Sequence, residues 1–524
     1  MAGHVEIQQP HDPAHQPPSK FEPAATHSAA ASMRDDEVYV VVNVPDSSCP
    51  ACIQPSNHDR GGGMKEADDA SSKHKLMPDD LSKRDRSQDT LESCDPDGAD
   101  SEEQEGEAKS CWETVKPFIG AGSMVAVGYM DPGNWATDLQ AGSSYNYSIL
   151  FVVLLSSLLA MFLQSMALRL GLVSGMDLAS ACRKKFSRYV HILLGVSAQV
   201  AICATDLAEV IGSAIAFKLL FGLPLFAGVL ITGLDVLVLL AFGQNRVIIM
   251  EIIIIVMILT MAVCFSIELY YSKPDGVELL KGMFVPTADL VTDSGMLYAS
   301  IGILGSIVMP HNFYLHSFLV CPREGPIQTG RSLKRSLRFA TLDCNLSLIV
   351  AFLINVCILV LAASAFHRAG YRDVADLEQA SSLIGNVVGE RAASTLFGLA
   401  LLLSGQQSTV TGTIAGQVVM EGFFDLKVHS AYIRIGTRLT AILPAVITIL
   451  VAGNAMINPL LVISQVILSM QLPFALIPLV ILTGDRNIMG SFVNSRLVHI
   501  AAWIISLFIV GLNFKLVVDS IMNK

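Results

Sequence analysis

Long apolar segments recur along most of this 524-residue chain, and no other feature limits its fold as strongly. A helix needs about 20 consecutive apolar residues to cross the hydrocarbon core of a bilayer. From Val115 onward such segments follow one another, with short polar loops between them. The sequence therefore predicts an all-α polytopic membrane protein with eleven transmembrane helices. The predicted spans are residues 117–142, 147–172, 189–213, 219–242, 247–270, 296–320, 339–366, 393–421, 436–452, 457–483 and 497–518.

The first 110 residues differ in composition from the apolar body. They hold 23 Asp and Glu against 10 Lys and Arg, whereas residues 111–524 hold 23 against 25. Their apolar content is too low to offset the entropy of ordering, so we expect a disordered acidic tail (1–110) followed by a membrane domain (111–524). No signal peptide is visible near Met1, and an acidic excess is not the basic face that binds nucleic acid. Cys49 and Cys52 have metal-site spacing, but a single such pair is weak evidence, and linker composition is the simpler interpretation.

Lys and Arg are unevenly divided between the two sets of alternating loops. Cytoplasmic loops of membrane proteins carry the excess of these residues. The more basic set holds fifteen of them: Arg183, Lys184, Lys185, Arg188, Arg246, Arg323, Arg331, Lys334, Arg335, Arg338, Lys427, Arg434, Arg438, Arg486 and Arg496. The opposite set holds seven: Lys273, Lys281, Arg368, Arg372, Arg391, Lys515 and Lys524. We therefore expect a cytoplasmic N-terminus and an extracellular or lumenal C-terminus, in either the plasma membrane or an endomembrane.

Two of the predicted helices, the first and the sixth, contain a proline near their midpoint with polar residues beside it. The first reads Met-Asp-Pro-Gly-Asn-Trp around Pro132, and the sixth reads Ser-Ile-Val-Met-Pro-His-Asn around Pro310. Proline removes a backbone hydrogen bond, and Gly133 loosens the chain further, so both helices are predicted to unwind there. Freed carbonyls at this depth must face protein, water or a ligand. A charged Asp131 in the membrane costs about 3 kcal/mol or more, which a bound cation would offset.

The two interrupted helices are five apart in the chain, so they cross the membrane in opposite directions. Matching interruptions of opposite orientation are typical of transporters with inverted repeats and a binding site at the midplane. Packing kinks are the simpler alternative, but a kink does not explain why Asp, Asn, Met and His gather at the breaks. A single buried site also favours alternating access over a channel. The sequence has no P-loop motif for ATP, and the tail has no foldable domain that would suit a sensor.

These motifs resemble those of the Nramp (natural-resistance-associated macrophage protein) divalent-metal transporters, over about residues 112–518. The resemblance rests on Asp131-Pro-Gly-Asn134, Met309-Pro-His-Asn312, Tyr314-Leu-His316-Ser317, Thr205-Asp206-Leu-Ala-Glu209, Gly412-Thr-Ile-Ala-Gly416-Gln417-Val-Val-Met420-Glu421-Gly422 and Gln471-Leu-Pro473-Phe-Ala. It implies a leucine-transporter-like fold with two inverted five-helix repeats, an eleventh helix, and helices one and six unwound at the midplane. It also implies a non-enzymatic secondary transporter that moves Mn²⁺ or Fe²⁺ into the cytoplasm together with protons. Cd²⁺ and Co²⁺ would be further substrates, and no cofactor would be permanently bound.

The side chains at the two breaks offer ligands of different hardness. Asp131 supplies an anionic oxygen, Asn134 an amide oxygen and Met309 a thioether. Mg²⁺ and Ca²⁺ prefer oxygen ligands, whereas a soft donor favours transition metals, so we interpret Met309 as a selectivity device rather than a packing residue. The resemblance adds the backbone carbonyl of Ser306, where the family usually has Ala, and Gln471 in one conformation.

Ionisable residues inside the predicted helices are candidate proton carriers. Asp131 would lose a proton when metal binds, and His311 has a side chain that titrates near neutral pH. His316, one turn further along, is equally consistent with a structural role. Asp235 in helix four is open to either interpretation.

Helix three carries a second candidate group for protons. Asp206 and Glu209 are three residues apart and therefore lie on one face of the helix. A static hydrogen-bonded pair that fixes helix packing is the alternative. By the resemblance, Arg434 and Arg438 at the cytoplasmic side of helix nine are candidate ion-pair partners.

An amino-acid symporter of the same fold is the nearest alternative function. Such proteins bind a substrate carboxylate at their unwound first helix, where Asp131 would repel it. The expected partners are therefore a divalent metal and the lipid bilayer, and not nucleic acid or ATP. Sorting or regulatory partners of the tail stay open.

Overall fold

The structure is a computed structural model that describes residues 120–522, without 242–246, 322–329, 388–390, 427–429 and 453–456. The expected tail, with Cys49 and Cys52, lies outside the described residues. Those that are described fall within one compact unit and form helices, turns and loops but no strand.

Each of the eleven predicted spans contains a helix or a pair of half-helices, which confirms the expected all-α fold class. The helices at these spans are α2 (Ala121–Gly128) with α3 (Pro132–Tyr145), α4 (Leu150–Ser174), α6 (Arg188–Phe221), α7 (Leu225–Ala241), α8 (Val247–Ser272), α11 (Ser294–Ile307) with α12 (His311–Leu319), α13 (Gly330–Ala362), α15 (Arg391–Phe424), α16 (Ser430–Ala452), α17 (Ile457–Thr483) and α19 (Arg496–Met522). The segments from α2 to α8 form the first set of five, those from α11 to α17 form the second, and α19 is the eleventh. The first segment of each set is a broken helix.

By length and composition alone, seven helical stretches of the described chain are apolar enough to cross a membrane. They are Pro132–Ser174, Arg188–Phe221, Glu251–Ser272, Ser294–Leu319, Ser332–His367, Pro459–Thr483 and Arg496–Lys515. The first of these joins α3 to α4, and shorter apolar helices at Leu225–Leu234 and Ile442–Val451 mark α7 and α16. The remaining helix, α15, contains the polar run Ser-Gly-Gln-Gln-Ser-Thr in its middle. The seven stretches, the two shorter apolar helices and α15 together account for the eleven predicted spans.

Several short helices lie in the connections, where no apolar pattern predicts them. They are α5 (Leu178–Lys185), α9 (Gly276–Phe284), α10 (Asp289–Thr292), α14 (Leu377–Val387) and α18 (Arg486–Met489), with the 3₁₀ turns η2 (Asn146–Ile149) and η6 (Gly490–Phe492) and the π-helical turn η4 (Ala363–His367). Aspartate N-caps begin four of them, including Asp376 before α14, whose Oδ1 accepts the backbone N–H groups of Glu378 and Gln379. Asp177, Asp275 and Asp485 each accept backbone N–H groups of the first turn of α5, α9 and α18, respectively. Such caps stabilise helices that are too short to be identified as membrane spans.

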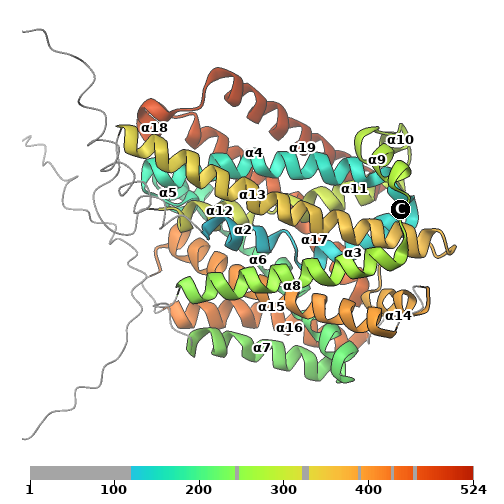
Figure 1. Cartoon of the computed structure of the whole chain (residues 1–524). Helices are drawn as coiled ribbons and strands as arrows, with labels where there is room; N and C mark the ends of the chain where they lie inside the picture. Colours follow the sequence, from blue (N-terminus) through green and yellow to red (C-terminus); the bar gives the residue numbers. More distant parts are fainter. Residues whose placement is uncertain are drawn as a thin grey trace, which may run out of the picture. The chain divides into compact units, whose positions relative to one another are not determined.

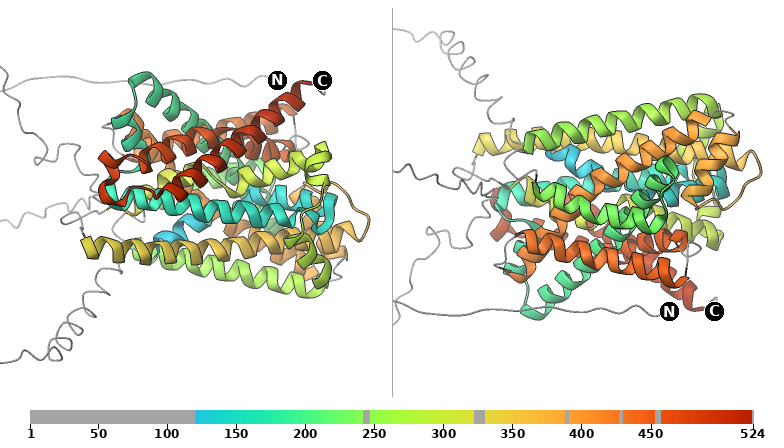
Figure 2. Two further views of the ribbon diagram at one scale, coloured as in Figure 1. Left: turned by 90° about the horizontal axis from the view of Figure 1, so that it is seen from above. Right: turned by 90° about the horizontal axis from the view of Figure 1, so that it is seen from below.

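The long helices run alongside one another, and the short ones gather at the two ends of the bundle. α5 and α18 lie at one end, whereas α9, α10 and α14 lie at the other (Figure 1). α13 packs against α4 and α8, and it lies between them in the left view of Figure 2. The most extensive helix pairing is that of α6 with α15. The half-helices α2, α3, α11 and α12 are enclosed by these longer helices.

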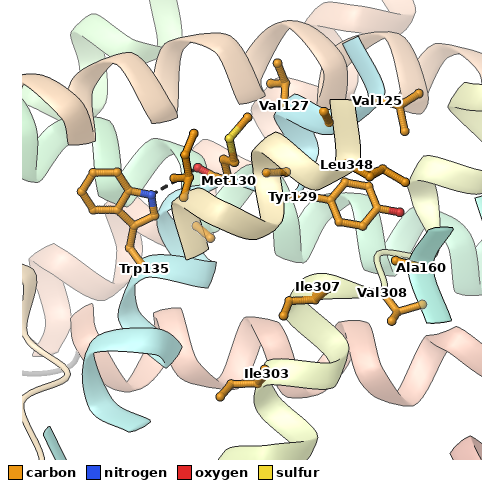
Figure 3. Packing of buried hydrophobic residues seen from close by; sticks show 14 of the residues in the cluster. Val125, Val127, Tyr129, Met130, Trp135, Ala160, Ile303, Ile307, Val308 and Leu348 are labelled. Atoms are coloured by element: carbon orange, nitrogen blue, oxygen red, sulfur yellow. Dashed lines mark hydrogen bonds between the residues drawn. The ribbon is translucent and has the colours of Figure 1, made fainter. Parts of the chain in front are cut away.

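Apolar side chains hold the broken first segment in place. Val125, Val127 and Leu348 pack on the α2 side of the break, and Trp135 lies just beyond it on α3 (Figure 3). The Trp135 ring contacts Phe265 on α8, with ring centroids 4.9 Å apart. Burial of large aromatic rings contributes strongly to packing energy, so the geometry of the break is fixed by its surroundings.

Candidate functional site

The first transmembrane segment is interrupted between α2 and α3. Asp131 is the N-cap of α3, and its Oδ1 accepts a hydrogen bond from the Asn134 backbone N–H at 2.9 Å. Pro132 occupies the first helical position, where its missing N–H costs no helical bond. The same missing N–H leaves the Gly128 carbonyl, four residues earlier, without an α-helical partner. Asp131 and Asn134 are completely buried.

The interruption frees backbone carbonyls, and nearby side chains bind some of them. The Tyr129 carbonyl accepts hydrogen bonds from the side-chain amides of Asn134 at 2.7 Å and Asn355 at 2.9 Å. The indole N–H of Trp135 donates to the Met130 carbonyl (Figure 3). Because the side-chain nitrogen of Asn134 already donates to the Tyr129 carbonyl, Oδ1 is the atom of this amide that is left to bind a cation. This atom and Asp131 Oδ2 are buried without a hydrogen-bond partner in the part of the chain that the structure describes.

The second break lies between α11 and α12 and leaves another carbonyl free. Ser306 belongs to the last turn of α11, and the residue four positions later is Pro310, which has no N–H to donate. Met309 lies in the gap itself and is completely buried. Its sulfur is 3.8 Å from the side-chain nitrogen of Asn312. The Ser306 hydroxyl donates to Ile303 within its own helix, so it leaves the Ser306 carbonyl unobstructed.

The two breaks face each other directly. The hydroxyl oxygen of Thr137 on α3 lies 3.4 Å from the hydroxyl oxygen of Ser306 on α11. On the other side of the gap, a Cβ placed on Gly128 would overlap the Asn312 side-chain amide. The structure therefore places the two predicted breaks against each other, with Thr137 beside Ser306 and Gly128 beside Asn312.

A glutamine that the sequence analysis did not select lies beside the first break. A Cβ on Gly133 would overlap Gln465 Nε2 of α17 and come within 3.1 Å of Asp131 Oδ2. The absence of a side chain at Gly133 thus admits the Gln465 amide next to the Asp131 carboxylate. Gln471, which the resemblance named, is also buried on α17. It lies six residues further along, near the Tyr314 side chain of α12.

The carboxylates of α6 meet α15 at a glycine. A Cβ on Gly412 would lie 3.0 Å from both Asp206 Oδ1 and Glu209 Oε1, so both acids point to the same position on α15. Ser408, one turn earlier on α15, donates its hydroxyl to Glu209 Oε1 at 2.6 Å. Asp206 and Glu209 are almost completely buried, at 1% and 0% exposure. Their predicted position on one inward face of the helix agrees with this geometry.

The two histidines of α12 have different surroundings. The His311 ring is 3.4 Å from the hydroxyl of Thr205, the residue that precedes Asp206 on α6. His316 Nδ1 is 2.8 Å from the Gln164 side-chain oxygen, and the Gln164 nitrogen donates to the Tyr129 hydroxyl. His311 thus borders the α6 carboxylates, whereas His316 belongs to a chain of hydrogen bonds that ends at the first break.

Five more ionisable residues belong to the long helices or to the half-helices of the breaks. Arg434 and Arg438 belong to α16, as expected, but their side chains and that of Asp235 lie outside the described residues. Asp138 on α3 and Glu268 on α8 are completely buried carboxylates that the sequence analysis did not use. A charge within a predicted span is the signal that would have selected them.

Comparisons with known proteins agree with one another. Residues 122–519 match the family described as natural resistance-associated macrophage protein-like. The chain is 46% identical over 414 residues to a protein of Nostoc sp. named divalent metal cation transporter MntH, covering 79% of this chain and 93% of the relative. A protein of the same name from Bradyrhizobium diazoefficiens is 48% identical over 413 residues, covering 79% and 91%.

Solved structures give the same result for the fold. The manganese transporter of Eremococcus coleocola, in complex with an aromatic bis-isothiourea compound, is 36% identical and has a TM-score of 0.72, covering 77% of this chain and 86% of that chain. The structure of MhsT in complex with L-phenylalanine is 15% identical with a TM-score of 0.53, covering 76% of this chain and 98% of that chain, which is a likeness of fold alone. These neighbours share the leucine-transporter-like architecture of inverted repeats.

Proposed function

This chain belongs to the Nramp family, and from that premise we propose that it is a proton-coupled secondary transporter that moves divalent transition metal ions into the cytoplasm. Mn²⁺ and Fe²⁺ are the proposed substrates, with Cd²⁺ and Co²⁺ as mimics. The relatives are named as transporters, so the chain is an integral membrane protein of a non-enzymatic class. The proposed partners are the metal, the proton and the bilayer.

The proposed metal site lies where the two breaks face each other. Its ligands are Asp131 Oδ2, Asn134 Oδ1, the Ser306 carbonyl and Met309 Sδ. The observation that carries this assignment is the pair of buried oxygens on Asp131 and Asn134 without a partner among the described residues. Buried polar atoms are nearly always hydrogen-bonded in proteins, and a cation satisfies such oxygens equally well.

The backbone supports a cation at the same point. α2 and α11 both end at the breaks, and the C-terminus of a helix carries a partial negative charge from its free carbonyls. Both carbonyls that the prolines free, at Gly128 and Ser306, belong to these two ends. Each break also holds the positive N-terminal end of a half-helix, α3 or α12, so the helix ends do not by themselves choose between a cation and a carboxylate. The negative charge of Asp131 is what disfavours an amino-acid carboxylate, and with it the symporter of the same fold.

The donor set supports a transition metal over the abundant alkaline-earth ions. Asp131, Asn134 and the Ser306 carbonyl are oxygen ligands that any divalent ion accepts. The Met309 thioether adds affinity mainly for softer ions. Gln465 is well placed beside Asp131 to donate to the carboxylate or to bind metal through its oxygen, and we assign it ahead of Gln471.

The proposed proton route leaves the metal site along α6. Asp131 releases a proton when metal binds, and His311 lies between the second break and Thr205. Asp206 and Glu209 continue the route at the interface of α6 and α15, towards the positions of Arg434 and Arg438 on α16. Buried carboxylates inside a bundle of membrane helices are typical of proton relays.

Uptake in proteoliposomes tests this function. Full-length protein is reconstituted and offered Mn²⁺, Fe²⁺, Cd²⁺, Co²⁺, Mg²⁺ and Ca²⁺ under an imposed pH gradient, while internal pH is recorded. We expect saturable Mn²⁺ uptake with proton influx, and neither with Mg²⁺ or Ca²⁺. Asp131→Ala, purified as monodisperse protein, should lose the uptake. Metal uptake that is retained in Asp131→Ala would refute the site, and uptake without proton movement would refute the coupling.

A further inference from the structure

A cavity of about 420 Å³ lies at the end of the bundle where α5 is found (Figure 1). It opens between the last turn of α5, the first turn of α6 and the last turn of α15. Arg183, Arg188 and His191 line one wall, and Phe423, Phe424 and Asp425 line the other. Nothing in the proposed transport route uses these side chains.

The charge on the wall of this cavity is only partly compensated. Arg183 forms an ion pair with Asp425, at 2.9 Å. Arg188 has no ion pair among the described residues, and His191 Nδ1 is buried there without a hydrogen-bond partner. Arg188, whose side chain is exposed, therefore leaves a guanidinium group free on this wall, which suits an anion with several oxygen atoms.

The start of α6 adds to this preference. Its N-cap, Ser187, makes no side-chain hydrogen bond to the first turn. The first N–H groups of a helix have no acceptor inside the helix, and they carry a partial positive charge that binds phosphate groups. Because Arg188 is the first residue of α6, its side chain and these N–H groups lie at the same end of the cavity.

The helix beyond the cavity has an apolar face without protein cover. Tyr189, Leu193, Val196 and Val200 recur at helical spacing on α6 and are 86%, 59%, 50% and 52% exposed. In a membrane such a stripe faces lipid chains, and a tyrosine at its end is typical of the interface between chains and headgroups. The basic cavity and the lipid-facing stripe thus adjoin each other on one helix.

We propose that this cavity binds the phosphate group of an anionic phospholipid whose acyl chains lie along the exposed stripe of α6. Basic pockets between transmembrane helices recognise lipid headgroups by the same chemistry. Free phosphate could bind the same basic groups, but it has no acyl chains to cover the exposed apolar stripe of α6. The acidic residues 1–110 are another source of negative charge, but a highly polar segment would likewise leave the stripe uncovered.

Native mass spectrometry of the detergent-solubilised full-length protein tests the proposal with dioctanoyl phosphatidic acid as the probe. We expect one bound lipid at saturation. Arg188→Gln should weaken binding about tenfold, as the loss of a charge-assisted hydrogen bond predicts. Lys184→Gln is the matched control, because Lys184 is exposed on α5 and does not line the cavity. It should change binding by less than about twofold. His191→Gln gives a second variant in the cavity, with a smaller loss, should Arg188→Gln fail to give monodisperse protein.

Three results would overturn the proposal. Equal losses in Arg188→Gln and Lys184→Gln would show general attraction to a basic surface. Competition by inorganic phosphate at the concentration at which the lipid binds would show a phosphate site without a lipid. Unchanged lipid binding in both Arg188→Gln and His191→Gln would show that the lipid binds away from the cavity.

Discussion

At the scale of single residues, the sequence predicts most of the candidate metal site. Proline alone does not decide where a membrane helix opens, since Pro444, Pro473 and Pro478 lie inside continuous helices. The signal at the two breaks is proline with polar residues beside it, which are tolerated at this depth only when they pair with freed backbone groups or bind a ligand. Gln465 could not be selected in this way. It lies in an unbroken helix with Gln471 six residues away, and only the rotation of α17 decides which of the two meets the first break.

Replacing Met309 with alanine should change metal selectivity rather than abolish transport. The variant keeps Asp131, Asn134 and the Ser306 carbonyl, so Mn²⁺ uptake should persist. Cd²⁺ should lose about tenfold in affinity, or about 1.4 kcal/mol, because it depends more on sulfur. Ca²⁺ and Mg²⁺ should become competitors, since an oxygen-rich and partly hydrated site suits them. Competition assays on both proteins under one pH gradient measure this, and unchanged exclusion of Ca²⁺ would make Met309 a packing residue.

The two glutamines of α17 provide a matched pair of variants. Gln465→Leu should reduce Mn²⁺ uptake about tenfold or more, because it removes an amide beside Asp131, and groups that orient a metal ligand contribute effects of this size. Gln471→Leu has the same chemistry at a position near Tyr314 and should have a smaller effect. The ratio of kcat/KM for the two variants is the measurement. A larger loss in Gln471→Leu would reverse the assignment.

At the scale of helices, the sequence predicts which segments span the membrane. It does not predict how each helix is rotated about its own axis, and so which residues of neighbouring helices meet. The spacing of Asp206 and Glu209 predicts a shared face. It does not predict that Gly412 of α15 lies against both carboxylates, with Ser408 bound to one of them. The short helices α5, α9 and α18 were missed because they have only eight, nine and four residues, too few for the long apolar segments that predict membrane spans.

A Glu209→Gln variant distinguishes the two interpretations of this face. The amide keeps the shape and can still pair with the Ser408 hydroxyl, but it does not carry a proton at neutral pH. If the residue is a relay, Mn²⁺ binding should be preserved while proton influx per metal ion falls severalfold. If the pair only fixes helix packing, thermal stability should fall and the ratio of protons to metal should stay constant. Internal pH and metal content, recorded in the same vesicles, separate these outcomes.

At the scale of the whole molecule, the inverted order of the two broken helices predicts the architecture, because it ties residues 178 positions apart in sequence, Pro132 and Pro310, to one site. The same reasoning assigns no part in transport to residues 1–110. Their composition gives no apolar core that could support the bundle.

Deletion of residues 1–105 should therefore leave Mn²⁺ transport intact. The expected kcat and KM in proteoliposomes are within about twofold of those of the full chain, since no ligand or proposed proton carrier is removed. Size-exclusion chromatography before reconstitution controls for folding. Loss of turnover in monodisperse truncated protein would mean that the tail takes part in the transport cycle.

The central claim is that one metal ion binds where the two broken helices meet, and anomalous X-ray diffraction tests it most directly. Crystals of the protein grown with Mn²⁺, and others with Cd²⁺, should each show one strong anomalous peak in contact with Asp131, Asn134 and Met309. The same peak should be missing from Asp131→Ala crystals grown under identical conditions. A peak away from both breaks, for example between Asp206 and Glu209, or one that survives in Asp131→Ala, would contradict the account.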